Sequence, residues 1–133
     1  MVKCHKLILS LASPVFKTQF YGSLKSTTDE EPIKIIDGCA KAFKDLIDFI
    51  YKEEHFDKFS SIDTSQTLRE VLDLYYFCEK YQVNHLRDYL HSVINQNFKI
   101  NGENVFRFFE DIEDYKLFDN VYAIIKEQLC AFL

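Results

Sequence analysis

The chain has 133 residues, 47% of them apolar and 13 of them phenylalanine, so a hydrophobic core can form without metal or disulfide support. A net charge of −5 and scattered lysines argue against binding to a nucleic-acid backbone, which requires clustered Lys and Arg. The three glycines lie far apart, which excludes the glycine-rich loops that bind phosphates or dinucleotides.

Cysteine spacing and hydropathy indicate the compartment. The four cysteines are widely spaced, at Cys4, Cys39, Cys78 and Cys130. They suit neither a zinc site nor a compact disulfide framework, so we expect partly buried thiols in a reducing compartment, with no metal or other cofactor. Residues 1–12 vaguely resemble a secretory signal, but Ser10 interrupts the short apolar run, and no run is long enough to span a membrane. We therefore expect a soluble cytoplasmic or nuclear protein.

The amino-terminal segment predicts a short strand and two helices, at residues 2–4, 6–12 and 13–21. Ser13 followed by Pro14 is typical of a helix start, because the serine hydroxyl accepts free amide protons and proline at the first helical position has none to leave unpaired. Gly22 ends the second helix, and a polar loop follows at residues 23–31.

A strand and a helix are predicted next. Residues 32–37 have branched side chains at strand spacing, bounded by Pro32 and by Asp37 with Gly38. From residue 40 to 51 the period becomes helical, with one apolar face formed by Phe43, Leu46, Ile47 and Ile50.

The carboxyl-terminal half predicts four helices. Asp63 with Gln66 is typical of a capping box, Asn84 starts the second of these helices and Asn101 caps the third. The apolar faces of the first two are Leu68, Val71, Leu72, Tyr75 and Cys78, then Leu86, Tyr89, Leu90, Val93 and Ile94. Those of the last two, a predicted hairpin, are Val105, Phe108, Phe109 and Ile112, then Leu117, Val121, Ile124, Ile125 and Leu129. The aromatic residues near 75–77 and 106–109 are predicted to be core. The predicted fold class is α+β, predominantly helical, with a small sheet flanked by helices.

No segment carries a catalytic signature, and we expect no enzymatic activity. Cys4 and His5 are neighbours, but consecutive strand residues point to opposite faces, so we expect their side chains to diverge and favour packing over a nucleophile pair. The carboxylate runs at residues 29–31, 110–111 and 113–114 are typical of solvated surface. What remains is a partner-binding module.

In their order and spacing these segments resemble the BTB (POZ) domain over about residues 2–96. The resemblance is carried by His5-Lys6-x-Ile8-Leu9, Ser13-Pro14-Val15-Phe16-x-x-x-Phe20, Ile33-x-Ile35-x-Asp37, Ala42-Phe43-x-x-Leu46-x-x-Phe49-Ile50-Tyr51 and Tyr75-x-x-Cys78-x-Lys80-Tyr81-x-Val83-x-x-Leu86. Residues 20–24 are most similar to the branch without kelch repeats, and residues 101–105 resemble the start of the BACK domain that commonly follows. The expected domains are a BTB/POZ domain at 1–97 and a partial BACK-like helical region at 98–133.

The resemblance implies a non-enzymatic adaptor that dimerises and docks onto a cullin-3 scaffold, while a further domain recruits the substrate for ubiquitination. By position, the cullin-binding surface would include Phe20, Tyr21, Leu24 and Tyr81. For Phe20, core packing is the more economical interpretation, whereas Leu24 follows the helix-ending Gly22 and is expected to be exposed.

Two departures from the family pattern bear on these expectations. The usual first strand, and the dimerising helix often found before it, are missing, which implies weakened dimerisation, an open sheet edge and exposed apolar surface on the helix at 6–12. Many cullin-binding members also carry a glutamate two residues after the hydrophobic residue that aligns with Leu24, and Ser26 stands there instead. Losing one charge-assisted contact costs on the order of 1–3 kcal/mol, which weakens docking without forbidding it.

Three other interpretations stay open. The chain is a homodimerisation or scaffolding module of a transcriptional or cytoskeletal protein without cullin binding, which Ser26 favours; or it is a hydrolase that uses Cys4 and His5; or it is an incomplete product that folds poorly alone.

Overall fold

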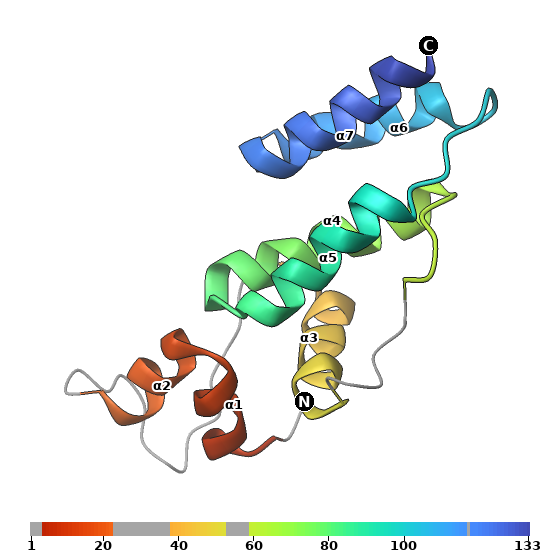
Figure 1. Ribbon diagram of the computed structural model, residues 1–133. Helices are drawn as coiled ribbons and strands as arrows, with labels where there is room; N and C mark the ends of the chain where they lie inside the picture. Colours follow the sequence, from red (N-terminus) through yellow and green to blue (C-terminus); the bar gives the residue numbers. More distant parts are fainter. Residues whose placement is uncertain (1–3, 23–37, 53–58, 117) are drawn as a thin grey trace. The chain divides into compact units, whose positions relative to one another are not determined.

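The computed structural model describes residues 4–22, 38–52, 59–116 and 118–133, and within these ranges the chain is almost entirely helical (Figure 1). Its elements are α1 (Lys6–Ala12), α2 (Pro14–Tyr21), α3 (Ala40–Lys52), α4 (Ser65–Tyr81), α5 (Asn84–Gln96), α6 (Val105–Ile112), the 3₁₀ helix η2 (Glu113–Tyr115) and α7 (Asp119–Phe132). The predicted helices at 6–12 and 40–51 and the helix start at Asn84 are confirmed to within a residue.

The predicted small sheet is not seen in the described residues. Both expected strands, at 2–4 and 32–37, fall outside them apart from Cys4, which is neither helix nor strand. The strand-like pairing among the described residues is one isolated parallel bridge between Ile62 and Phe98. There the Ile62 N–H donates to the Asn97 carbonyl at 2.9 Å, and the Lys99 N–H donates to the Ile62 carbonyl at 2.8 Å.

The chain divides into two compact units, Met1–Phe56 with Asp73–Arg87 and Asp57–Leu72 with Asp88–Leu133. In the first unit, α1 packs against both α2 and α3. The buried apolar residues of this unit are Leu9, Phe16, Phe20, Ala42, Leu46, Ile47, Phe49, Leu74, Tyr75, Phe77, Cys78, Tyr81, Val83 and Leu86. The backbone also packs closely at Gly38, which has a φ of 87°, and a Cβ added there would lie 2.4 Å from the ring of Phe77. This position therefore requires glycine.

In the second unit the caps differ from those predicted. Thr64, not Asp63, accepts the Thr67 N–H at 3.2 Å, and α4 begins at Ser65. The hydroxyl is one residue closer to the helix, so it reaches the amide three residues on, as an N-cap does. Asn101 accepts the amides of Glu103 and Asn104 at 2.9 Å each, closing a turn just before α6 begins at Val105.

The α6–α7 hairpin is confirmed as a pair of packed helices in the second unit (Figure 1). The buried apolar residues of this unit are Phe59, Ile62, Leu68, Val71, Leu72, Leu90, Val93, Ile94, Val105, Phe108, Ile112, Val121, Ile125 and Leu129. Two predictions for α6 are wrong: Phe106 is 65% exposed rather than core, and Asp111 is buried rather than part of a solvated acidic surface. In an α-helix, Asp111 lies three residues after Phe108 and joins its buried face, whereas Phe106 lies two residues before it on the opposite side.

Candidate partner-binding surfaces

The start of α2 is fixed by Ser13, which is fully buried. Its hydroxyl accepts the Phe16 N–H at 3.1 Å and donates to the carbonyl of Tyr81, at the end of α4. The serine thus satisfies a free amide of one helix and a free carbonyl of another. The next residue, Gln82, turns the chain with a φ of 54°, and the Val83 N–H closes that turn onto the Cys78 carbonyl at 3.1 Å.

Two of the four residues predicted to bind a partner, Phe20 and Tyr81, stack on Phe16 inside the first unit. The Phe16 ring stacks on Tyr81 at 4.2 Å and on Phe20 at 5.7 Å between centroids. Phe20 and Tyr81 are both buried, so in this chain their side chains contribute to the core beneath α2. Tyr21 is 59% exposed at the end of α2, and Leu24 lies outside the described residues. The structure thus brings Phe20 and Tyr81 together around Phe16, and it leaves Tyr21 accessible.

A second exposed surface lies on α1. Leu7 is 62% exposed and Leu11 is 81% exposed, which agrees with the apolar surface expected on this helix. The two side chains are four residues apart and so share one side of the helix. Leu9 is buried, so α1 carries leucine toward the core and toward solvent alike. Leu7 and Leu11 are candidates for partner binding that the family motifs do not single out. The sequence does carry a signal for them, because this seven-residue helix has apolar residues on both of its sides.

The Cys4–His5 pair lacks the environment of a nucleophile. Burial raises the pKa of the Cys4 thiol above its usual value, which disfavours the reactive thiolate. The His5 backbone N–H donates to the Tyr51 hydroxyl at 2.7 Å, and the His5 Nδ1 lies 2.9 Å from the same oxygen. Both contacts tie the start of α1 to α3.

The rest of the described chain offers little other chemistry. It contains no group of three or more His, Cys, Asp or Glu side chains placed to hold a metal ion. None of its helices is both long and apolar enough to cross a membrane. Among the cysteines, Cys78 is buried and Cys4 half-buried, but Cys39 and Cys130 are exposed, contrary to the expectation that all four are partly buried.

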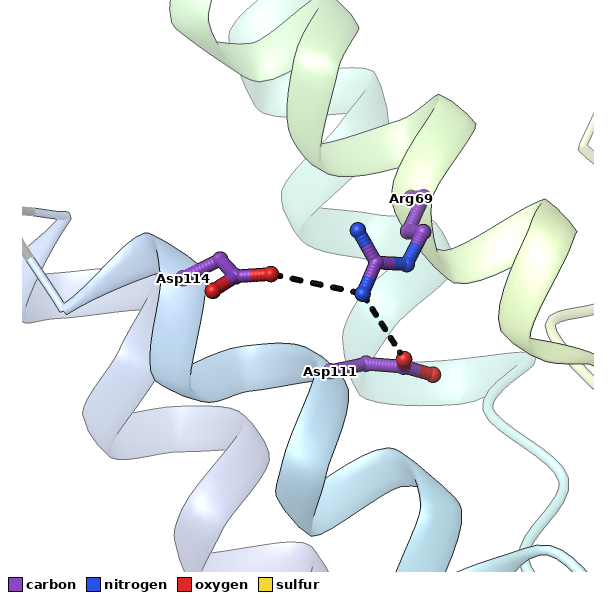
Figure 2. A network of polar contacts seen from close by, with 3 residues as sticks. All are labelled: Arg69, Asp111 and Asp114. Atoms are coloured by element: carbon purple, nitrogen blue, oxygen red, sulfur yellow. Dashed lines mark hydrogen bonds and ion pairs between the residues drawn. The ribbon is translucent and has the colours of Figure 1, made fainter.

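A polar network lies inside the second unit. Arg69 of α4 reaches α6, where its Nη2 contacts Asp111 Oδ1 at 3.2 Å, and it reaches η2, where the same nitrogen contacts Asp114 Oδ2 at 3.3 Å (Figure 2). Burial alone would lower the pKa of Arg69, but the hydrogen bond and charge of Asp111 outweigh it, and the pKa is raised. This network was not predicted, because the partners are 42 and 45 residues apart.

The described residues thus form capped helices with aromatic packing inside and exposed apolar side chains on α1 and at the end of α2. The family model of the BTB/POZ domain matches residues 1–98. The chain therefore belongs to the BTB/POZ family, whose domain is a protein–protein interaction module that mediates homo- and heterodimerisation. No solved structure matches the chain.

Proposed function

We propose that this protein is a substrate adaptor of a cullin-3 ubiquitin ligase. The observation that carries the proposal is the exposed ring of Tyr21, which ends α2 in a chain of the BTB/POZ family. Membership in the branch without kelch repeats and a BACK-like identity for residues 98–133 are part of the same proposal. It assigns the chain a docking role, with no catalytic step and no cofactor.

The packing beneath α2 supports a preformed docking surface. Phe16 and Phe20 fix the inner side of the helix, and the Ser13 cap fixes its start. The outward positions, Pro14, Lys17, Thr18 and Tyr21, are exposed. Because the helix is held rigidly, a partner that meets Tyr21 orders few further side chains on binding, and less of the interaction energy is lost. In this proposal Phe20 and Tyr81 support the surface from within, while Tyr21 and Leu24 meet the scaffold.

A binding titration of the full chain with an amino-terminal cullin-3 fragment tests this assignment. Tyr21→Asp and Leu24→Asp should each weaken binding at least tenfold, since truncating a central aromatic or apolar contact costs about 1–3 kcal/mol. Leu11→Asp serves as the matched control, because it adds the same charge at an exposed apolar position on another helix. A folded wild-type chain that shows no binding would refute the adaptor function.

Homodimerisation without cullin binding is the second candidate, and the exposed leucines of α1 favour it. Leu7 and Leu11 form an apolar surface that a second BTB domain could cover. Light scattering coupled to size exclusion would measure the mass with and without the cullin fragment. A dimer that Leu11→Asp dissociates, and that ignores the cullin fragment, would favour the scaffolding function. A cullin complex lost only with the Tyr21 and Leu24 variants would favour the adaptor.

A further inference from the structure

Asp111 is a charged residue in an apolar place. It lies on the inner face of α6 between Phe108 and Ile112, and its side chain is only 8% exposed. Its Oδ2 is buried and, among the described residues, has no hydrogen-bond partner. Its Oδ1 contacts Arg69 alone in that part of the chain. Burying a carboxylate with half of its hydrogen-bonding capacity unused is unfavourable unless a positive charge compensates it.

Arg69 supplies this compensation from the surface. Its side chain is about half exposed, and the single nitrogen Nη2 serves both Asp111 and Asp114 (Figure 2). Asp114 is largely exposed, so its contact with Arg69 adds little to the docking of the helix. The charge balance of the buried Asp111 thus depends on one arginine that solvent reaches.

Further polar contacts of the hairpin lie away from Asp111. Asn104 Nδ2, at the start of α6, donates to the carbonyls of Asp63 and Lys99 at 3.1 Å each. Gln128 of α7 donates to the Ile94 carbonyl at 2.9 Å. Arg69 and Asp111 therefore hold the carboxyl-terminal end of α6, which the ties from Asn104 do not reach.

We propose that Arg69 and Asp111 form a latch that makes the docking of the α6–α7 hairpin conditional on one ion pair. While the pair is intact, the apolar face of α6 stays packed within its unit. When Arg69 is removed or its charge is taken up elsewhere, the buried carboxylate is left uncompensated, and the end of α6 with the hairpin opens toward water. Opening exposes the apolar face that contains Phe108 and Ile112. The latch is a conformational device that is independent of cullin binding and of dimerisation.

Hydrogen exchange of the full chain, measured by mass spectrometry, tests the latch. Arg69→Met should raise the exchange of amides in residues 105–132 at least tenfold and leave residues 40–52 in the other unit unchanged. Arg107→Met is the matched control, because Arg107 is an exposed arginine of α6 and should leave both regions unchanged. Equal exchange of residues 105–132 in Arg69→Met and wild type would overturn the proposal.

The double variant Arg69→Met/Asp111→Asn separates a latch from ordinary packing. Without a charge at position 111 the loss of Arg69 should matter little, so exchange in the double variant should be slower than in Arg69→Met and within threefold of that in Asp111→Asn alone. Exchange as fast as in Arg69→Met alone would overturn the latch, since the arginine would then act through its packing. If Arg69→Met unfolds the whole chain, recovery of the fold in the double variant supports the proposal and failure to recover overturns it.

Discussion

Two short helices, α1 and α6, differ in how much of their apolar surface is buried. In α1, Leu7 and Leu11 face solvent while Leu9 is buried. In α6 the apolar side chains Val105, Phe108 and Ile112 face inward together with Asp111, and Phe106 faces solvent. Full burial of a leucine contributes about 1.5–3 kcal/mol, so the leucines of α1 leave a sizeable stabilisation unused in this chain.

The difference separates residues that fold the chain from residues available to a partner. The two leucines of α1 contribute little to folding as long as they stay in water, and a covering protein would gain their burial energy. The inner face of α6 contributes directly to folding, and its buried Asp111 is paired with Arg69.

The largest expected change in the free energy of unfolding is that of Phe108→Ala in α6, with Phe106→Ala as its control. Phe108 is fully buried and meets Phe98 edge-on, with centroids 5.0 Å apart, whereas Phe106 is mostly exposed. Phe108→Ala should lower the free energy of unfolding by about 3–5 kcal/mol through lost burial and a cavity. Phe106→Ala should change it by less than about 0.5 kcal/mol. Urea unfolding followed by circular dichroism measures both, and similar losses for the two would contradict the orientation of α6.

A smaller effect is expected from the caps that start α2 and α4. Ser13→Ala should cost about 2 kcal/mol, because it removes a buried hydroxyl that serves both the Phe16 amide and the Tyr81 carbonyl. Thr64→Ala should cost about 0.5–1 kcal/mol, because water can replace the exposed hydroxyl at the Thr67 amide. The urea midpoints of the two variants measure these stability losses. A larger loss for Thr64→Ala than for Ser13→Ala would mean that burial does not determine how much a capping hydroxyl stabilises this chain.

Helix positions could be predicted because their signals are local. The Ser13–Pro14 start, the end at Gly22 and the apolar periodicity at 40–51 depend on neighbours within a few residues, and the structure confirms the helices there. Local signals do not select a single cap for α4, since Asp63 and Thr64 are both good capping residues and only the path of the chain selects Thr64. Three phenylalanines lie within residues 106–109, so the apolar periodicity does not show which of them face the core. The prediction that Phe106 is core is wrong for this reason.

The surfaces were harder to predict, because exposure and pairing depend on distant segments. The family resemblance places both Phe20 and Tyr21 at the partner-binding surface, although core packing is the favoured interpretation for Phe20. The structure buries Phe20 against Phe16, as that interpretation predicts, and leaves Tyr21 accessible. Likewise, Asp111 and Asp114 belong to two neighbouring acidic runs with the same predicted exposure, although the structure buries only Asp111 beside Arg69. The domain boundary at 97 and the partner-binding roles remain predictions.

The smallest expected change in the free energy of unfolding is that of Leu11→Ser, and it tests whether α1 is a free surface. Leu11→Ser should change the free energy of unfolding by no more than about 0.5 kcal/mol, because the side chain is already 81% exposed. Leu9→Ala, two residues away and buried, should cost about 2–4 kcal/mol and serves as the control. Urea unfolding at low protein concentration makes this comparison without contributions from association. A large loss for Leu11→Ser under those conditions would show that Leu11 stabilises the single chain, and α1 would then not be a free surface for a partner.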